Sequence, residues 1–287
     1  MCQLVVNLHR AMCAVAMGAF ALAPGLRAED KLPSPHHCDL NVAKLTQAQC
    51  LLSQVARYGE LGPPLSNLPP PWPALLGDAP RRVPAVPAMR SLLSDRGINE
   101  ADLGGSLDAP VSRTARGERA RYFIIHDTSA PTLPAGGSGF PLEINGEPWS
   151  EKYLKQLSAA ANAHVFVGRT GKSRTAVGFD KPLLTTKFER NGDRTRLVGM
   201  FLGVENLQPR RLDAKGIDSI APVPGFTPPQ LQRLALIYVA ASVRAGTWLV
   251  PVYHAVLDGG IKNAHDDPQD FDLQGFSAAV LELLDVL

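Results

Sequence analysis

Short apolar runs in the second half of the chain have the composition of β-strands. Most are rich in β-branched or aromatic residues, and Gly, Asn or Asp lies close to their ends, as is typical of strands. The runs are Tyr122–Ile125, Val165–Val167, Arg174–Val177 and Leu197–Val204. We expect these four segments to form one sheet.

Three longer segments of the same half are predicted to be helices. The first is Glu151–Ala161. The second begins at Pro228, where Thr227 can cap the first turn and proline needs no hydrogen-bond acceptor, and it ends at Gly246. The third is Phe271–Leu287. Together with the strands, they predict an α/β fold in which a mixed central β-sheet is flanked by helices.

The first 118 residues differ in composition. Between Cys38 and Tyr58, apolar positions recur at steps of three and four, which predicts an amphipathic helix. Proline dominates Gly62–Pro87 and favours extended backbone over a regular helix or a central strand. A short helix is expected over Met89–Arg96. We therefore expect residues 29–118 to be an N-terminal arm with short helices and a Pro-rich linker, and residues 119–287 to be the main domain.

The N-terminus has the features of an export signal. Arg10 precedes the apolar run Ala11–Ala23, which is too short to span a bilayer as a mature helix, and Ala28 offers a small residue at a cleavage position. We expect a signal peptide over residues 1–28 and an exported protein, periplasmic or secreted, with no stable membrane span after processing. An uncleaved N-terminal anchor is the alternative.

Cleavage of this signal would leave Cys38 and Cys50 as the two remaining cysteines. In an oxidising compartment, such a pair predicts a disulfide. His36 and His37 lie beside Cys38, so a compact His/Cys metal cluster is the alternative.

The charge of the chain indicates no nucleic-acid partner. Its 29 basic and 27 acidic side chains are spread along the sequence and give a formal charge of +2, without a basic stripe. The 45% hydrophobic content is enough for a full core.

Three possible metal ligands stand far apart in the sequence. His126 ends the first strand run, His254 follows Val252-Tyr253, and Asp267 precedes Pro268 in a later loop. Two imidazoles and one carboxylate can hold a catalytic Zn²⁺ and leave one position for water. The sequence therefore predicts a zinc site, with Asp266 or His265 as alternatives for the third ligand.

Four sequence blocks follow one another in the main domain. They are Phe123–Ser129 around His126, Ala163-His164 through Gly168–Gly171, Leu202–Asn206, and His254 through Asp267-Pro268 to Phe271-Asp272. Their order resembles a known family, the zinc-dependent N-acetylmuramoyl-L-alanine amidases of the amidase-2 type, which are related to peptidoglycan recognition proteins. The resemblance covers residues 119–287 and not the N-terminal arm.

The resemblance implies roles for individual residues. His126, His254 and Asp267 match the zinc ligands of the family, and Glu205 matches the group that takes the proton from the attacking water. The second catalytic position is open, because the last loop is longer than in the common Lys-x-Asp-Pro version. Counting forward from His254 gives Lys262, and counting back from Asp267 gives His265. We prefer His265, since a residue close to a metal ligand has its direction fixed by that ligand, whereas Lys262 lies further from Asp267.

Structural roles are the alternatives for several of these residues. Glu205 could instead form an ion pair with Arg194, Arg196 or Arg210. Asp127 could accept a hydrogen bond from a ligand imidazole or be an ordinary turn residue. His164 is expected to support the fold or the pocket wall rather than to bind zinc.

The resemblance implies an exported zinc hydrolase that cleaves the amide bond between N-acetylmuramic acid and L-alanine in peptidoglycan or muropeptides. A module of the same fold that binds these molecules without hydrolysing them is the alternative. A zinc peptidase of another family is disfavoured, because the sequence has no His-Glu-x-x-His motif.

Overall fold

The computed structural model describes residues 31–35, 38–136, 139–190, 192–216 and 219–287. The signal peptide expected over residues 1–28 lies outside these ranges. The described helices and strands belong to one compact unit, residues 33–287. None of the helices in the described ranges is both long enough and apolar enough to cross a membrane.

The centre of this unit is a mixed five-stranded sheet with the order β4-β3-β5-β1-β8. Four strands are parallel, and β4 runs antiparallel to β3. The strands are β1 (Tyr122–Asp127), β3 (Val165–Val167), β4 (Ser173–Thr175), β5 (Phe201–Asn206) and β8 (Val250–Tyr253). Every residue of β1, β3 and β8 is buried, which explains why these strands have almost no polar alternation. The expected mixed α/β fold is confirmed.

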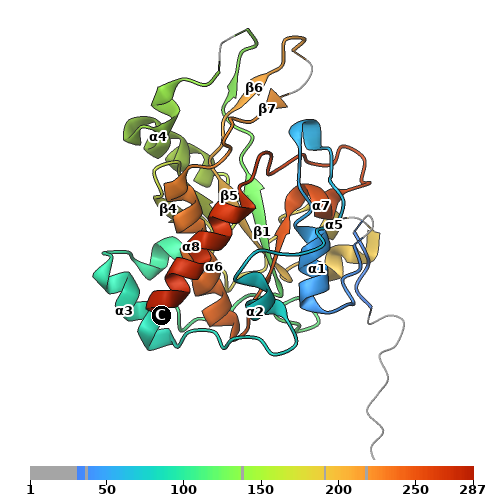
Figure 1. Cartoon of the computed structure of the whole chain (residues 1–287), viewed down its shortest axis with the longest axis vertical. Helices are drawn as coiled ribbons and strands as arrows, with labels where there is room; N and C mark the ends of the chain where they lie inside the picture. Colours follow the sequence, from blue (N-terminus) through green and yellow to red (C-terminus); the bar gives the residue numbers. More distant parts are fainter. Residues whose placement is uncertain (1–30, 36–37, 137–138, 191, 217–218) are drawn as a thin grey trace, which may run out of the picture. The chain divides into compact units, whose positions relative to one another are not determined.

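Helices flank the sheet. The α-helices are α1 (Lys44–Leu51), α2 (Trp72–Leu76), α3 (Val86–Asp95), α4 (Glu147–Ser158), α5 (Lys187–Arg190), α6 (Pro228–Ala245), α7 (His254–Asp258) and α8 (Leu273–Val286). Short 3₁₀ helices are η2 (Arg57–Gly59), η3 (Glu100–Leu103), η4 (Leu142–Asn145) and η5 (Gly192–Leu197). The long helices α6 and α8 pack side by side, α1 packs on β8, and α4 packs on β3 and β4 (Figure 1).

The ends of α6 follow the predicted signals. The Thr227 hydroxyl accepts a hydrogen bond from the backbone N–H of Gln230, and the Gln230 side chain accepts one from the N–H of Thr227, which forms a capping box. At the other end, Gly246 adopts a left-handed conformation with a φ of 70°. The boundaries of this buried central helix are therefore set by local sequence.

The helix expected over Cys38–Tyr58 is shorter than predicted and covers only Lys44–Leu51. The Cα atoms of Cys38 and Cys50 lie 5.7 Å apart, although the two residues are separated by 12 positions. Twelve helical residues would span about 18 Å. A continuous helix from Cys38 to Cys50 is thus incompatible with the link between these residues.

The Pro-rich segment Gly62–Pro87, expected to contain no regular helix, contains α2. Pro73 lies in the first turn of α2, where its missing N–H has no helical acceptor. Trp72 is fully buried, and its indole Nε1–H donates to the Ser277 hydroxyl of α8 over 2.6 Å. Tyr238 of α6 meets the Trp72 ring edge-on, with centroids 5.3 Å apart. Tertiary packing of Trp72 therefore stabilises a turn that the proline pattern disfavours.

A second, three-stranded sheet was not expected. Its order is β2-β6-β7, and β6 and β7 are labelled near the top of Figure 1. The strands are β2 (Thr132–Leu133), β6 (Arg210–Leu212) and β7 (Ser219–Ile220). Strands of two or three residues are too short to show an alternating pattern.

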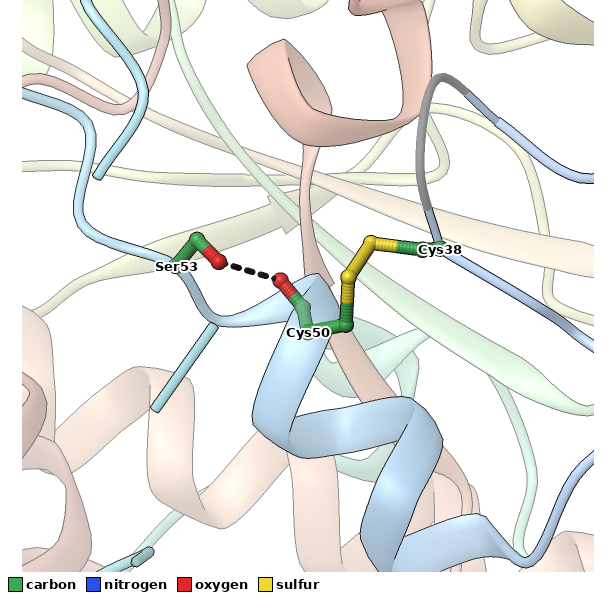
Figure 2. Close-up of a disulfide and its surroundings, with 3 residues drawn as sticks. All are labelled: Cys38, Cys50 and Ser53. Carbon is green, nitrogen blue, oxygen red and sulfur yellow. Dashed lines mark hydrogen bonds between the residues drawn. A yellow bond between two sulfur atoms is a disulfide. The ribbon is translucent and has the colours of Figure 1, made fainter. Parts of the chain in front are cut away.

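Cys38 and Cys50 form the predicted disulfide, which joins the end of α1 to the segment before it (Figure 2). The hydroxyl of Ser53 donates to the Cys50 carbonyl over 2.7 Å, and the backbone N–H of Ser53 donates to the same carbonyl over 3.0 Å, so Ser53 supplies two donors at the helix end. Because the two sulfur atoms are bonded to each other, neither cysteine is a thiolate that could bind a metal in a His/Cys cluster. His36 and His37 lie outside the described residues.

A capping box also defines the short helix α5. The N–H of Glu189 donates to the Thr186 hydroxyl, and Glu189 Oε2 accepts from the N–H of Thr186, each over 3.1 Å. Glu189 Oε2 also accepts from the N–H of Thr185 over 3.0 Å. Burial raises the pKa of Glu189 to about 7, although these hydrogen bonds favour the carboxylate.

Reduction of the disulfide should destabilise the protein by about 3 kcal/mol, because the crosslink closes a loop of 12 positions in the unfolded chain. Urea unfolding with and without reductant measures the effect. The Cys38→Ser/Cys50→Ser variant should match the reduced protein and respond no further to reductant. Equal unfolding midpoints for oxidised and reduced protein would contradict the prediction.

Replacement Glu189→Gln should flatten the dependence of stability on pH. The folded-state pKa of about 7 lies above the ordinary value of 4.5, so the contribution of Glu189 is fully present below pH 4.5 and is lost as the pH rises through 7. The loss is at most about 3 kcal/mol. Unfolding free energies at pH 5 and pH 8 should therefore differ less in the variant than in the parent protein. An equal difference in unfolding free energy between pH 5 and pH 8 in the two proteins would contradict the raised pKa of Glu189.

Candidate metal centre

Three parallel strands bring candidate residues to one edge of the central sheet. His126 of β1 lies in register with Glu205 of β5. Strand β8 pairs with β1 as far as Tyr253, opposite Ile125, and His254 follows as the first residue of α7. Residues in register on parallel strands project to the same face. The topology therefore gathers His126, Glu205 and His254 at the carboxyl ends of the strands.

Asp267 reaches the same place from the last loop, 13 positions after His254. The backbone N–H of Asp127, at the end of β1, donates to Asp267 Oδ2 over 3.1 Å. The backbone carbonyl of Asp267 accepts from the N–H of Ala255 in α7 over 2.7 Å. These two hydrogen bonds hold the buried Asp267 against both histidine-bearing elements.

The side chains of His126, His254 and Asp267 converge. The two Nδ1 atoms of the histidines lie 2.8 Å apart. Asp267 Oδ1 lies 3.0 Å from His254 Nδ1, and Asp267 Oδ2 lies 3.5 Å from His126 Nδ1. Tetrahedral ligand atoms about 2.0–2.2 Å from one zinc ion are roughly 3.3–3.6 Å apart. The donor types suit a divalent metal, and the ligand atoms lie at this spacing or slightly closer together, so these residues form a group that could hold one.

The surrounding charges favour a cation at this position. Burial and the charge of His254 lower the pKa of His126 to about 4, so His126 is neutral at pH 7 and able to bind a metal. Burial alone would lower the pKa of His254, but the carboxylates of Asp267 and Asp258 raise it to about 10. The two carboxylates thus stabilise a positive charge at His254, and a bound metal ion would also supply such a charge.

Glu205 lies beside the three converging side chains. Its Oε1 is 4.0 Å from His126 Nδ1, and its buried Oε2 has no hydrogen-bond partner among the residues that the structure describes. Burial and the nearby Asp267 carboxylate raise the pKa of Glu205 well above its ordinary value. A buried carboxyl group with an unsatisfied oxygen is suited to exchange a proton with a bound molecule.

Gly203 permits the packing around His126. A Cβ on Gly203 would lie 2.8 Å from Thr185 Cγ2 and 3.2 Å from His126 Nε2, so a larger residue would displace the ring. The N–H of Gly203 donates to His164 Nδ1, and His164 Nε2 donates to the Lys181 carbonyl, each over 3.1 Å. His164 is fully buried and supports β5 from outside the group of three ligands.

A buried ion pair fixes the end of β1. Arg210 of β6 contacts Asp127 through two nitrogens, with Nη2–Oδ2 at 2.7 Å and Nε–Oδ1 at 3.3 Å, and both side chains are 0% exposed. Asp127 Oδ2 also accepts from the N–H of Gln269 in the last loop over 3.2 Å. Burial alone would lower the pKa of Arg210, but the carboxylates of Asp127 and Asp266 raise it. Arg210 therefore pairs with Asp127 and not with Glu205. Asp127 Oδ1 also accepts from the N–H of Ser129 over 2.9 Å, as expected of a turn residue, and the ion pair is an additional role that the sequence did not indicate.

The structure separates the three candidates for the third ligand. Asp267 lies with His126 and His254, whereas Asp266 pairs with Arg210 over 3.4 Å. His265 lies on the opposite edge of the His254 ring, with its Nδ1 2.8 Å from His254 Nε2.

The two candidates for the second catalytic position differ in their surroundings. The side chain of His265 is 49% exposed, and its Nδ1 is held beside α7 by the contact with His254. Lys262 is exposed in the turn that follows α7.

Asp258 is a residue of this region that sequence interpretation missed. Its Oδ2 lies 3.0 Å from His254 Nε2 and 3.5 Å from His265 Nδ1. The three side chains form a second group with the composition of a metal site. The signal was the four-residue spacing from His254 to Asp258, which places both on one helix face. This spacing has a meaning only in a helix, and the residues after His254 were expected to form a loop, so the pair was not recognised.

Comparison with known proteins adds little to this geometry. No protein-family model matches the chain, and no curated protein is significantly similar to it. A solved structure described as the crystal structure of a selenomethionine derivative of AmpD aligns with 62% of this chain and 98% of its own, at 22% identity and a TM-score of 0.38. A likeness this weak carries no argument about function, so the site is judged on its own residues.

Replacement Arg210→Met should destabilise the protein by about 3–5 kcal/mol, because it leaves the buried Asp127 carboxylate without its partner. The variant Arg210→Met/Asp127→Leu should lose less stability than the sum of the two single variants. Urea unfolding of all four proteins measures this coupling. Strict additivity would contradict the assignment of a coupled pair.

Proposed function

We propose that this protein is a zinc-dependent hydrolase that cleaves the amide bond between N-acetylmuramic acid and L-alanine in peptidoglycan or muropeptides. The convergence of His126, His254 and Asp267, with Glu205 beside them, is the observation that carries the proposal. The ordered sequence blocks that resemble amidase-2 enzymes point to the substrate class.

In this proposal, His126 and His254 would hold Zn²⁺ through Nδ1, and Asp267 would hold it through its carboxylate. Two neutral imidazoles and one carboxylate leave the site with a net positive charge when a divalent ion is bound. When bound, Zn²⁺ would polarise the amide carbonyl and lower the pKa of water, which makes hydrolysis of a stable amide feasible near neutral pH.

Glu205 is the proposed general base and then the general acid. Its carboxylate takes a proton from the attacking water and returns it to the amide nitrogen that leaves with the peptide. Glu205 needs its carboxylate form for the first step, and a nearby dication favours that form over the protonated one. His265, half exposed and next to His254, is the proposed second group, which stabilises the developing negative charge on the carbonyl oxygen.

Export is part of the proposal, because peptidoglycan lies outside the cytoplasm. The disulfide between Cys38 and Cys50 supports it, since structural disulfides persist mainly in oxidising compartments. The apolar run behind Arg10 is the proposed signal. The proposed partner is therefore a peptidoglycan or muropeptide substrate.

Purified protein should release stem peptide from muropeptides, lose this activity with a chelator and regain it with Zn²⁺. Glu205→Gln should lower kcat about 10²–10⁴-fold, because it removes the proton carrier. Its zinc content should stay at that of the parent protein. Product analysis by mass spectrometry and metal analysis measure these effects.

The control is Glu282→Gln, which changes an exposed carboxylate of α8 and should leave both activity and zinc content intact. Binding of muropeptides without release of peptide, unaffected by Glu205→Gln, would identify a binding module and overturn the enzyme proposal. A parent protein that binds no zinc would refute the metal site itself.

A further inference from the structure

The side chain of Asp258 is a fully buried carboxylate. The proposed reaction gives it no role. Asp258 ends α7, four positions after His254, so both side chains lie on the same face of one helical turn. Asp258 Oδ2 lies 3.0 Å from His254 Nε2, the ring nitrogen that faces away from His126 and Asp267. A fully buried carboxylate needs partners that offset its desolvation.

Asp258 is also held from the opposite side by α5. Its Oδ1 accepts from the backbone N–H of Phe188 over 2.8 Å, and its Oδ2 accepts more weakly from the N–H of Lys187 over 3.4 Å. The capping box of Thr186 and Glu189 fixes the turn that presents these N–H groups. The orientation of Asp258 is therefore set before any metal arrives.

A neutral imidazole carries one N–H, so the nitrogen that donates determines which nitrogen can bind a metal. His254 Nε2 has two neighbours, Asp258 Oδ2 at 3.0 Å and His265 Nδ1 at 2.8 Å. The carboxylate can only accept, so donation from His254 Nε2–H to Asp258 leaves the Nδ1 lone pair directed at His126 and Asp267. We propose that Asp258 is a positioning residue that holds His254 in the tautomer and orientation required to bind the metal through Nδ1. This inference rests on the proposed zinc site and deepens it.

His254, Asp258 and His265 could instead hold a second metal ion, since their ligand atoms also converge. That arrangement would require His254 to bind one ion through each ring nitrogen and to lose both N–H protons. It would also require Asp258 to bind a metal with a carboxylate that already accepts two backbone N–H groups. Donation of a hydrogen bond from His254 Nε2 to Asp258 requires neither change. The contacts therefore favour Asp258 as a residue that orients His254 over Asp258 as a ligand of a second metal ion.

The zinc-loaded parent protein provides a test that needs no variant. Long-range ¹⁵N–¹H NMR of the histidine rings distinguishes protonated from metal-bound nitrogens. The inference expects His254 to have a slowly exchanging Nε2–H and a metal-bound Nδ1. An unprotonated Nε2, or two zinc ions per chain, would overturn it.

The variants Asp258→Asn and Asp258→Ala test the consequence for binding. Each should weaken zinc affinity 10–100-fold in competition with a chromophoric chelator, the usual effect of losing such a partner of a ligand histidine. The Nε2–H of His254 should exchange faster in both. Asn matches the shape of Asp, and circular dichroism verifies the fold of each variant. Asp285→Asn, on the exposed side of α8, is the control and should change neither quantity.

The outcomes separate this inference from the proposed function. A parent protein that binds zinc and hydrolyses muropeptides, together with folded Asp258 variants of unchanged zinc affinity, would refute the positioning role and leave the proposed function intact. Weaker zinc binding with faster exchange of the His254 Nε2–H would support the positioning role whatever the substrate is.

Discussion

The parallel alignment of β1 with β5 and β8 is the constraint on which the candidate site depends. Parallel pairing places the carboxyl ends of these strands at one edge, and the register of β1 with β5 sets His126 opposite Glu205. The end of β8 opposite Ile125 then delivers His254 to the first turn of α7. A shift of one residue in either pairing would turn the affected side chain to the other face of the sheet. The complete burial of β1 and β8 opposes such a shift, because every side chain would have to repack against the layer on the opposite face.

Charged side chains hold in place the candidate ligands that the strand register brings together. The buried pair of Asp127 and Arg210 anchors the last loop, and the N–H of Asp127 directs the carboxylate of Asp267 toward the histidines. Asp267 and Asp258 then lie on opposite edges of the His254 ring. Buried carboxylates in this arrangement require a positive charge between them, which a proton on His254 supplies when no metal is bound. This distribution of charge favours a cation beside His254.

Local signals in the sequence predicted the strand that ends at His126 and the central helix, but not helix α7, which begins with His254, nor the residues that support the ligands. The apolar run before His126, the Thr227 cap and Gly246 each act within a few residues, so the strand and the central helix could be inferred. The contact of Asp258 with Phe188 spans 70 positions and that of Arg210 with Asp127 spans 83, and no periodic pattern encodes such distances. Helix α2 was missed for the same reason, since its stability comes from the packing of Trp72 against α6 and α8. The assignment of ligand roles came from the family resemblance and not from periodicity.

Anomalous diffraction at the zinc absorption edge, from crystals grown with Zn²⁺, would test the account most directly. The account predicts a single strong peak about 2.0–2.2 Å from the Nδ1 atoms of His126 and His254 and from a carboxylate oxygen of Asp267. The Nε2 atom of His254 should face Asp258 with no peak between them. A peak bounded by His254 Nε2, Asp258 and His265, or no peak near His126, would contradict the account.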